Sequence, residues 1–177
     1  PSLTVLSSTS TLASQVTTLS QTFISVHESS ATLAWAALPA SPDSESAAYG
    51  YRLEASSTNF SSLLPGGAVY SSQTANVALS TLTLSVPALE RNTTYYFRVG
   101  SLNWNSHPNY AVLGSSSTAS PAVVSIQVYR SFESSATLNW QALPATPQSL
   151  ASEGYSLEAS STNFGALFPG GLVKSTS

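Results

Sequence analysis

The stretch from Leu89 to Val99 restricts the fold of this chain more than any other. It reads Leu-Glu-Arg-Asn-Thr-Thr-Tyr-Tyr-Phe-Arg-Val, and from Tyr95 onward the residues alternate between two faces. Tyr95, Phe97 and Val99 share one face, and the residues between them point the other way. A period of two is typical of a half-buried β-strand. We therefore expect a strand that turns Tyr95 and Phe97 into a core.

The residues before this strand predict a tyrosine corner. Leu89 stands six positions before Tyr95, and Asn92-Thr93-Thr94 supplies a turn between them. With this spacing the ring packs inward, and its hydroxyl bonds the backbone of the connection that it has just left. Burial of such a ring stabilises a fold by about 1.5–3 kcal/mol. Leu89, Thr93 and Tyr95 are the predicted structural corner.

An internal repeat organises the rest of the chain. The segment 28–73 recurs as 133–177, with roughly two thirds of the aligned residues identical and a period of about 105 residues. The segment 5–11 is also similar to 112–118, which places Thr11 opposite Thr118. We therefore expect residues 1–14 to be the last strand of a preceding repeat. Residues 15–120 form a complete domain, and 121–177 form the N-terminal half of a following one.

Alternation of apolar and polar residues predicts about seven short strands in the complete copy. They are expected near 23–28, 31–35, 51–55, 82–86, 95–99 and 110–113, with 69–70 and 77–79 as short strands or edge pieces. The sequence does not decide which face of the first strand, 23–28, points into the core. Trp35, Tyr51, Leu53 and Phe97 are predicted core residues, and Trp140 is the predicted core residue of the partial copy. Short strands of this number and spacing indicate an antiparallel two-sheet sandwich.

With these residues in place, the chain resembles the fibronectin type III family. The resemblance is carried by Trp35 on the second strand, by Tyr51 and Leu53 on the third, and by the corner, although Arg91 stands where the family usually has proline. It extends to the partial copy through the residues that repeat Trp35, Tyr51 and Leu53. The resemblance implies an all-β, immunoglobulin-like antiparallel β-sandwich in tandem repeats. It also implies adhesion, spacing or scaffolding, as in tandem arrays of long bacterial surface proteins.

The amino-acid composition excludes several classes of function. Only 7% of the residues are charged, the net charge is -3, and cysteine is absent. A disulfide framework and thiolate metal sites are thereby excluded, and there is no basic footprint for nucleic acid or anionic membranes. No apolar run reaches the length of a membrane span. Low charge, abundant hydroxyl side chains and short strands favour an extracellular or cell-surface location.

The sequence offers no catalytic constellation. His27 and His107 fall on different elements, whereas a zinc site needs three or four convergent ligands. Asp43 and Glu45 cluster in a Ser/Pro-rich loop, where solvation is a better interpretation than a calcium contact. No Gly-x-Ser-x-Gly elbow is present, and no base stands beside a candidate serine. We expect no enzymatic activity and no cofactor.

Two kinds of surface residue stand out. Trp104 lies between two asparagines in the loop after the corner strand, with Tyr110 following it. Both are candidate contacts to a partner or glycan. The favoured interpretation is that Trp104 packs over the end of the sandwich and seals the contact to the next domain. Asn92 and Asn59 each begin an Asn-x-Ser/Thr acceptor pattern for N-glycosylation.

The sequence supports three hypotheses about function. The leading hypothesis is a non-enzymatic structural or adhesive repeat of an extracellular rod, stalk or filament. A second is a module that binds a glycan or a protein through Trp104 and its neighbours. A third is a self-assembling subunit whose incomplete half is completed by strand exchange. The expected partners are neighbouring repeats or identical subunits, with a surface glycan or protein as a further candidate. Nucleic acid and membrane insertion are not expected.

Overall fold

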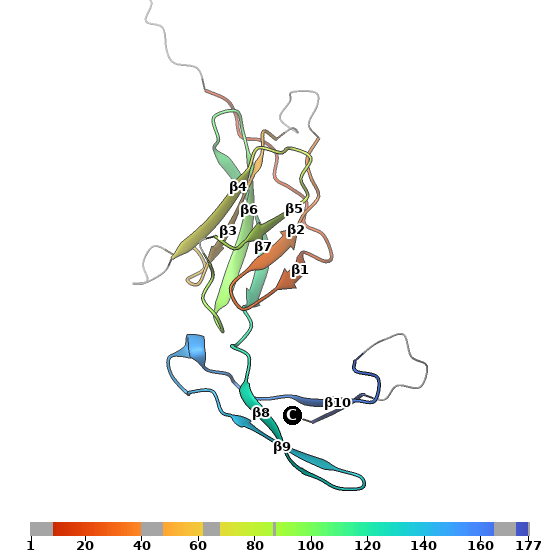
Figure 1. Cartoon of the computed structure of the whole chain (residues 1–177). Coiled ribbons are helices and arrows are strands. Elements are labelled where there is room, and N and C mark those ends of the chain that lie inside the picture. The colour runs from red at the N-terminus through yellow and green to blue at the C-terminus, as the bar shows by residue number, and fades with distance from the viewer. Residues whose placement is uncertain (1–8, 40–47, 62–67, 87, 165–172, 177) are drawn as a thin grey trace, which may run out of the picture. The chain divides into compact units, whose positions relative to one another are not determined.

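The structure, a computed structural model, describes residues 9–39, 48–61, 68–86, 88–164 and 173–176. The chain divides into two compact units, Pro1–Ser120 and Pro121–Ser177, which are drawn in one cartoon in Figure 1. The segment 9–14, the described part of the predicted last strand of a preceding repeat, carries no strand and belongs to the first unit.

The first unit is a sandwich of two antiparallel sheets (Figure 1). One sheet has the strand order β1-β2-β5, and the other has the order β4-β3-β6-β7. The strands are β1 (Phe23–Val26), β2 (Ala31–Ala34), β3 (Tyr51–Ser56), β4 (Val69–Thr74), β5 (Thr81–Leu84), β6 (Thr94–Leu102) and β7 (Pro108–Ser117). The predicted all-β, fibronectin type III-like sandwich is thereby confirmed.

The strand prediction differs from the structure in its details, and β4 and β6 are longer than expected. The expected piece near 77–79 is a turn, because Asn76 accepts a hydrogen bond from the Ala78 amide through its side-chain oxygen at 3.1 Å. The last strand is also longer than the apolar pattern indicates. It runs from Pro108 to Ser117 because its polar residues pair along the whole length of β6.

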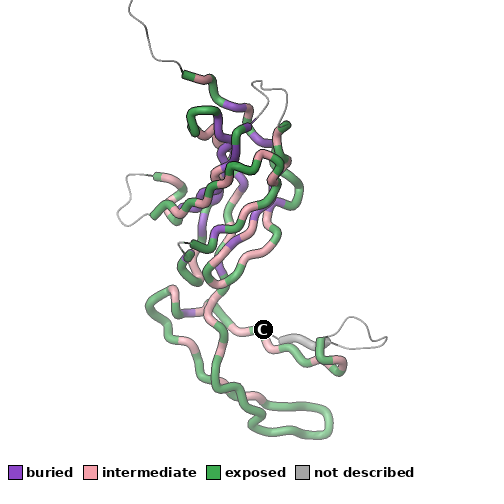
Figure 2. Tube along the Cα trace, turned by 45° about the horizontal axis from the view of Figure 1, so that its top comes forward, coloured by how far each residue is buried: buried purple, intermediate pink, exposed green. Residues whose placement is uncertain are grey.

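The core lies between the two sheets, where alternate residues of each strand meet (Figure 2). Trp35 and Tyr51 are fully buried, with ring centroids 5.3 Å apart. The packing also settles the open question of the first strand: Phe23 points inward, and its ring meets that of Phe97 edge-on at 5.6 Å. Leu53 and Phe97 are likewise buried. Edge-to-face contacts of this kind add about 0.5–1.5 kcal/mol to area burial.

The second unit repeats the first half of this architecture. It contains β8 (Val124–Ser131), β9 (Ala136–Gln141), a short 3-10 helix η1 (Gln148–Leu150), β10 (Leu157–Ser160) and β11 (Val173–Thr176). These strands form two separate pairs, β8-β9 and β10-β11. In their order along the chain, they correspond to β1-β2 and β3-β4.

Local geometry recurs together with the sequence. The Tyr51 hydroxyl accepts a hydrogen bond from the Leu38 amide at 2.7 Å, and the Tyr155 hydroxyl accepts one from the Leu143 amide at the same distance. The rings of Trp140 and Tyr155 stand 5.4 Å apart, close to the 5.3 Å of the corresponding pair in the first unit. The two copies therefore share side-chain contacts as well as amino-acid sequence.

The prediction that Trp140 is a core residue is wrong for this structure. Trp140 is only half-buried, whereas its counterpart in the first unit is fully buried. Within the described part of the second unit, no strand pairs with the outer edge of β9 or of β10. Among the described strands of this unit, the ring lacks counterparts of β5, β6 and β7 to cover it.

Candidate functional site

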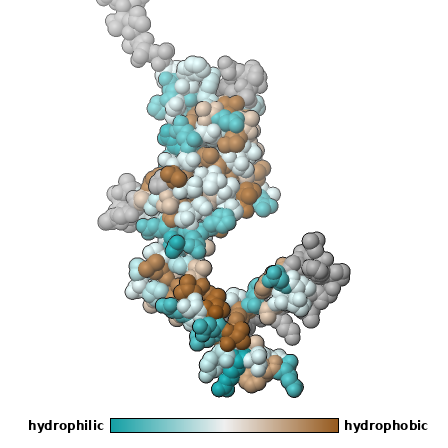
Figure 3. Space-filling model, in the orientation of Figure 1, coloured by the Kyte–Doolittle hydropathy of each residue, from teal (hydrophilic) through white to brown (hydrophobic). Residues whose placement is uncertain are grey.

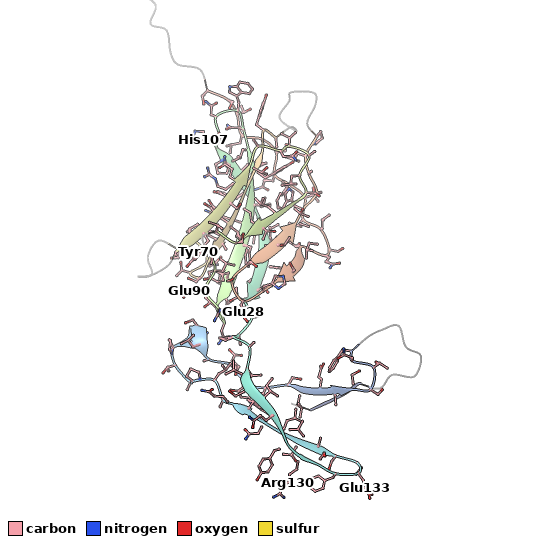
Figure 4. All side chains as sticks on the ribbon, in the orientation of Figure 1. Glu28, Tyr70, Glu90, His107, Arg130 and Glu133 are labelled. Carbon is pink, nitrogen blue, oxygen red and sulfur yellow. The ribbon has the colours of Figure 1, made fainter. Side chains whose placement is uncertain are left out.

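The first unit holds its chain connections at two opposite ends, which Figure 4 marks by the labels Glu90 and His107. At the Glu90 end lies the predicted corner. Tyr95 and Leu89 are buried, and the Glu90 amide donates a hydrogen bond to the Tyr95 hydroxyl at 3.0 Å. Burial of the ring raises the pKa of Tyr95 to about 12.

The segment that leaves the sandwich is tied to this corner through Thr118. The buried Thr118 hydroxyl donates to the Glu90 carbonyl at 2.6 Å and accepts from the Thr93 amide at 3.0 Å. The Thr118 amide donates to the Thr93 carbonyl, also at 3.0 Å. We call Glu90, Thr93 and Thr118 the C-terminal clamp. The corner therefore fixes the exit of the chain as well as the start of β6.

Two backbone bonds extend the C-terminal clamp by one residue. The Ala119 amide donates to the His27 carbonyl at 3.2 Å, and the Ala119 carbonyl accepts from the Asn92 amide at 3.1 Å. The chain is thus held on both sides immediately before Pro121.

At the opposite end, polar side chains hold the segment that enters the sandwich. Asn103 donates through its side-chain amide to the Thr11 carbonyl at 2.9 Å, and Asn109 donates to the Ala13 carbonyl at 2.7 Å. The buried Ser101 hydroxyl donates to the next carbonyl, that of Ser14. We call Ser101, Asn103 and Asn109 the N-terminal clamp. Sequence reasoning missed these residues, because no motif marks them.

Asn103 also shapes the loop that carries Trp104. Its side-chain oxygen accepts hydrogen bonds from the amides of Asn105 and His107, at 3.1 and 2.8 Å. The side chain is buried, so both of its polar atoms are used where water cannot compete. One residue therefore orders the loop and holds the incoming segment at the same time.

Trp104 is exposed, which contradicts the expectation that the ring is covered at the end of the sandwich, whereas its contact to a neighbouring domain stays a prediction. Its exposed fraction is 70%, and its ring meets Tyr49 edge-on at 4.8 Å. Beside it lies a cleft of about 250 Å³. The described lining residues are Tyr49, Gln73, Thr74, Ala75, Leu102, Asn103, Trp104 and Ser106. Hydrogen bonds within the loop hold its shape, so the loop conformation does not depend on burial of the indole.

Tyr110 does not join Trp104 at this cleft. Its hydroxyl donates to Glu54 at 2.7 Å, and Glu54 pairs with Arg98 at 2.7 Å. The Arg98 guanidinium stacks on the rings of Phe60 and Tyr110, at 3.9 Å from each centroid. Burial and the neighbouring carboxylate raise the pKa of the Tyr110 hydroxyl. This network braces the outer face of the four-stranded sheet.

The predicted glycosylation residues lie in turns. Asn59 is exposed with a φ of 51°, and Asn92 is half-buried in the corner turn with a φ of 47°. Asparagine tolerates this left-handed region better than most residues. Glycosylation of either side chain stays a prediction.

The described residues contain no group of three or more His, Cys, Asp or Glu side chains that could hold a metal ion. The His27 carbonyl bonds Ala119 at the corner end, whereas His107 lies at the other end. Asp43 and Glu45 fall outside the described residues. Among the described segments, no helix is long and apolar enough to cross a membrane.

Comparison with known proteins yields similarities to solved structures alone. No protein-family model matches the chain, and no curated protein matches it. Among solved structures, the chain is similar to the FN5 domain of Drosophila Lar, with 14% sequence identity and a TM-score of 0.41. The match covers 63% of this chain and 100% of that one. The fold assignment rests on the strand order and register described above.

Proposed function

We propose that this chain is a non-enzymatic structural repeat of an extracellular or cell-surface rod. The observation that carries the proposal is the pair of clamps: the first unit binds the backbone that enters it and the backbone that leaves it. A sandwich with free ends would leave its linkers flexible. A sandwich that fixes both ends transmits a defined direction from one neighbour to the next.

One linker between two repeats could be bound by the C-terminal clamp of the first repeat and the N-terminal clamp of the second at the same time. The sequence repeat places Thr11 opposite Thr118. The N-terminal clamp uses the carbonyl of Thr11, whereas the C-terminal clamp uses the amide and the hydroxyl of Thr118. In an array, the residue at this position would present different atoms to the sandwich before it and to the sandwich after it. Each linker would then be held from both sides.

Small-angle X-ray scattering tests this proposal on a two-repeat chain, made by joining residues 1–118 to a second copy of 12–120. The junction keeps the shared threonine in place. We expect a narrow distribution of interdomain distances that matches a rigid rod. Asn109→Ala in the second copy removes one donor of the N-terminal clamp, and we expect it to broaden that distribution.

Asn76→Ala is the matched control, because Asn76 lies in a turn and takes no part in either clamp. We expect it to leave the scattering unchanged. A wild-type chain that already bends freely would contradict the rod proposal, as would an Asn109→Ala chain that is as rigid as the wild type.

A second candidate function, self-assembly, is favoured by the second unit. Apolar side chains gather on a face of this unit (Figure 3), and Val124, Ile126 and Val128 are more than half exposed. A cavity of about 350 Å³ is lined by residues that include Tyr129, Leu138 and Trp140. An open sheet edge beside an apolar face can recruit strands from identical subunits.

Sedimentation of the 177-residue chain over a range of concentrations distinguishes the two candidates. Self-assembly predicts a mass that rises with concentration, together with a shift of Trp140 fluorescence toward shorter wavelength. A single species of 18.4 kDa at every concentration would rule out self-assembly and leave the structural repeat as the remaining candidate.

A further inference from the structure

We propose that the cleft beside Trp104 binds one ring of a neutral carbohydrate. This inference goes beyond the spacer function and does not depend on it. The first argument is the aromatic platform itself. Trp104 is 70% exposed, and Tyr49 supports it edge-on with the two rings at 86°. An indole presented in this way offers a flat apolar face to the C–H side of a sugar ring, with a polar surrounding.

The platform is preorganised. The Asn103 side chain holds the backbone that follows Trp104, through the amides of Asn105 and His107. The Tyr49 amide donates to the Leu102 carbonyl at 2.9 Å, which ties the supporting ring to the root of the same loop. A weak ligand therefore binds without the entropy cost of ordering the loop.

The polar lining suits a neutral polyol. Arg52 donates twice to the Gln73 side-chain oxygen, at 2.8 and 3.0 Å, so the Gln73 amide nitrogen is oriented as a donor. The Thr74 hydroxyl accepts from the Asn76 amide, which leaves its own hydrogen to donate. Ser106 adds a second hydroxyl at the exposed rim. None of the described lining residues carries a charge, and the nearby Arg52 guanidinium is engaged by Gln73, which favours a neutral ligand.

The dimensions of the cleft indicate a single ring. Its volume of about 250 Å³ lies below the range of roughly 300–1,000 Å³ that is typical of pockets for larger ligands. Two exposed aromatic residues are also too few for a protein partner, because stable protein interfaces bury about 800 Å² on each side. A sugar unit of a longer glycan fits both limits.

Nuclear magnetic resonance titration of the 177-residue chain tests the inference. The probes are methyl β-glucoside, methyl β-galactoside and methyl N-acetyl-β-glucosaminide, with methyl β-glucuronide as the anionic comparison and tetramethylammonium as the cationic one. We expect at least one neutral glycoside to shift the Trp104 indole N–H and the Ser106 amide saturably. The Trp35 indole, buried in the core, should not move.

Trp104→Ala should weaken this binding at least about tenfold, as expected for an aromatic anchor. Its unfolding midpoint should stay near that of the wild type because the side chain is mostly exposed. Val112→Ala is the matched control: it removes an apolar side chain that is 74% exposed elsewhere on the same unit, and it should bind like the wild type.

Several outcomes would overturn the inference. They are no shift with any neutral glycoside, equal binding by Trp104→Ala, and a response only to the glucuronide or only to tetramethylammonium. A response to tetramethylammonium alone would reassign the platform to cation–π binding. None of these results would affect the scattering experiment, so the failure of one proposal is distinguishable from the failure of the other.

Discussion

At the residue scale, Tyr95 links the core to the chain exit. Its ring lies in the core beside Tyr70 and Phe97, with centroid distances of 5.6 and 6.4 Å. Its hydroxyl accepts the Glu90 amide, and the Glu90 carbonyl accepts the Thr118 hydroxyl. A change at the hydroxyl therefore affects a hydrogen-bond chain that ends at the linker.

Tyr95→Phe should lower the free energy of unfolding by about 0.5–1.5 kcal/mol at neutral pH, because the Glu90 amide loses its acceptor while the ring stays packed. Urea denaturation of both proteins measures the difference. A loss near that of a core truncation, about 3–5 kcal/mol, would show that the ring itself had moved.

Tyr95 also predicts how stability depends on alkaline pH. Burial raises its pKa from 10.0 to about 12, so the folded state keeps a proton that the unfolded chain releases. This contribution is fully present below about pH 10 and is lost as the pH rises toward 12. The pKa values of Tyr51 and Tyr110 are raised in the same direction, also chiefly by burial.

Tyr95→Phe should consequently show a shallower loss of stability than the wild type between pH 10 and 12. The measurement is the urea midpoint at several pH values in this range. Parallel profiles for the two proteins would contradict the assignment of part of the loss to Tyr95.

At the scale of the element, β6 and β7 position both clamps. Their ladder contains a bulge: Phe97 pairs with Gly114, whereas Arg98 pairs with Val112. The residue between, Leu113, is left over and points into the core. Gly114 takes a φ of +115° at this point, where an added Cβ would lie 3.5 Å from the Phe23 ring.

Gly114→Ala should destabilise the first unit by about 1–3 kcal/mol, because the backbone there is strained for any residue with a Cβ. The comparison variant is Val112→Ala, two residues earlier on the same strand, whose side chain is exposed. Thermal unfolding followed by tryptophan fluorescence separates the two. Equal melting temperatures would show that the bulge relaxes at no cost.

At the scale of the whole molecule, the two units share one sequence pattern but differ in the strands that the structure describes. The first unit has β5, β6 and β7 to cover its aromatic core, and Trp35 is fully buried. The second unit has the same pair of rings at nearly the same separation, yet Trp140 is half-buried. The burial of this tryptophan is thus set by the strands that cover it and not by its contact with the neighbouring tyrosine.

Extension of the chain after Ser177 with residues 74–120 should complete the second unit. The register of the sequence repeat places Ser177 opposite Gln73, so this extension supplies the strands that correspond to β5, β6 and β7. We expect Trp140 fluorescence to shift toward shorter wavelength and the added amides to become protected from hydrogen exchange. An extension that stays unprotected would refute the interpretation of 121–177 as half of a sandwich.

The sequence by itself determined the fold class, the corner and the repeat. Alternation around Tyr95 and Phe97 is local information, and so is the spacing from Leu89 to Tyr95. The contacts of Tyr51 and Tyr155 recur because their sequence neighbours recur. Residues of this kind have their role set mainly by polarity and spacing along one strand.

Only the tertiary structure decided the exposure of Trp104, the inward face of Phe23 and the N-terminal clamp. Asn103 bonds a carbonyl that lies 92 residues away in the chain, and Asn109 bonds one 96 residues away. Any backbone carbonyl can accept such a bond, so the partner carries no signature that a sequence could reveal. Trp140 makes the same point for packing, because it is less buried than Trp35 although the two rings stand in the same local sequence and the same aromatic pair.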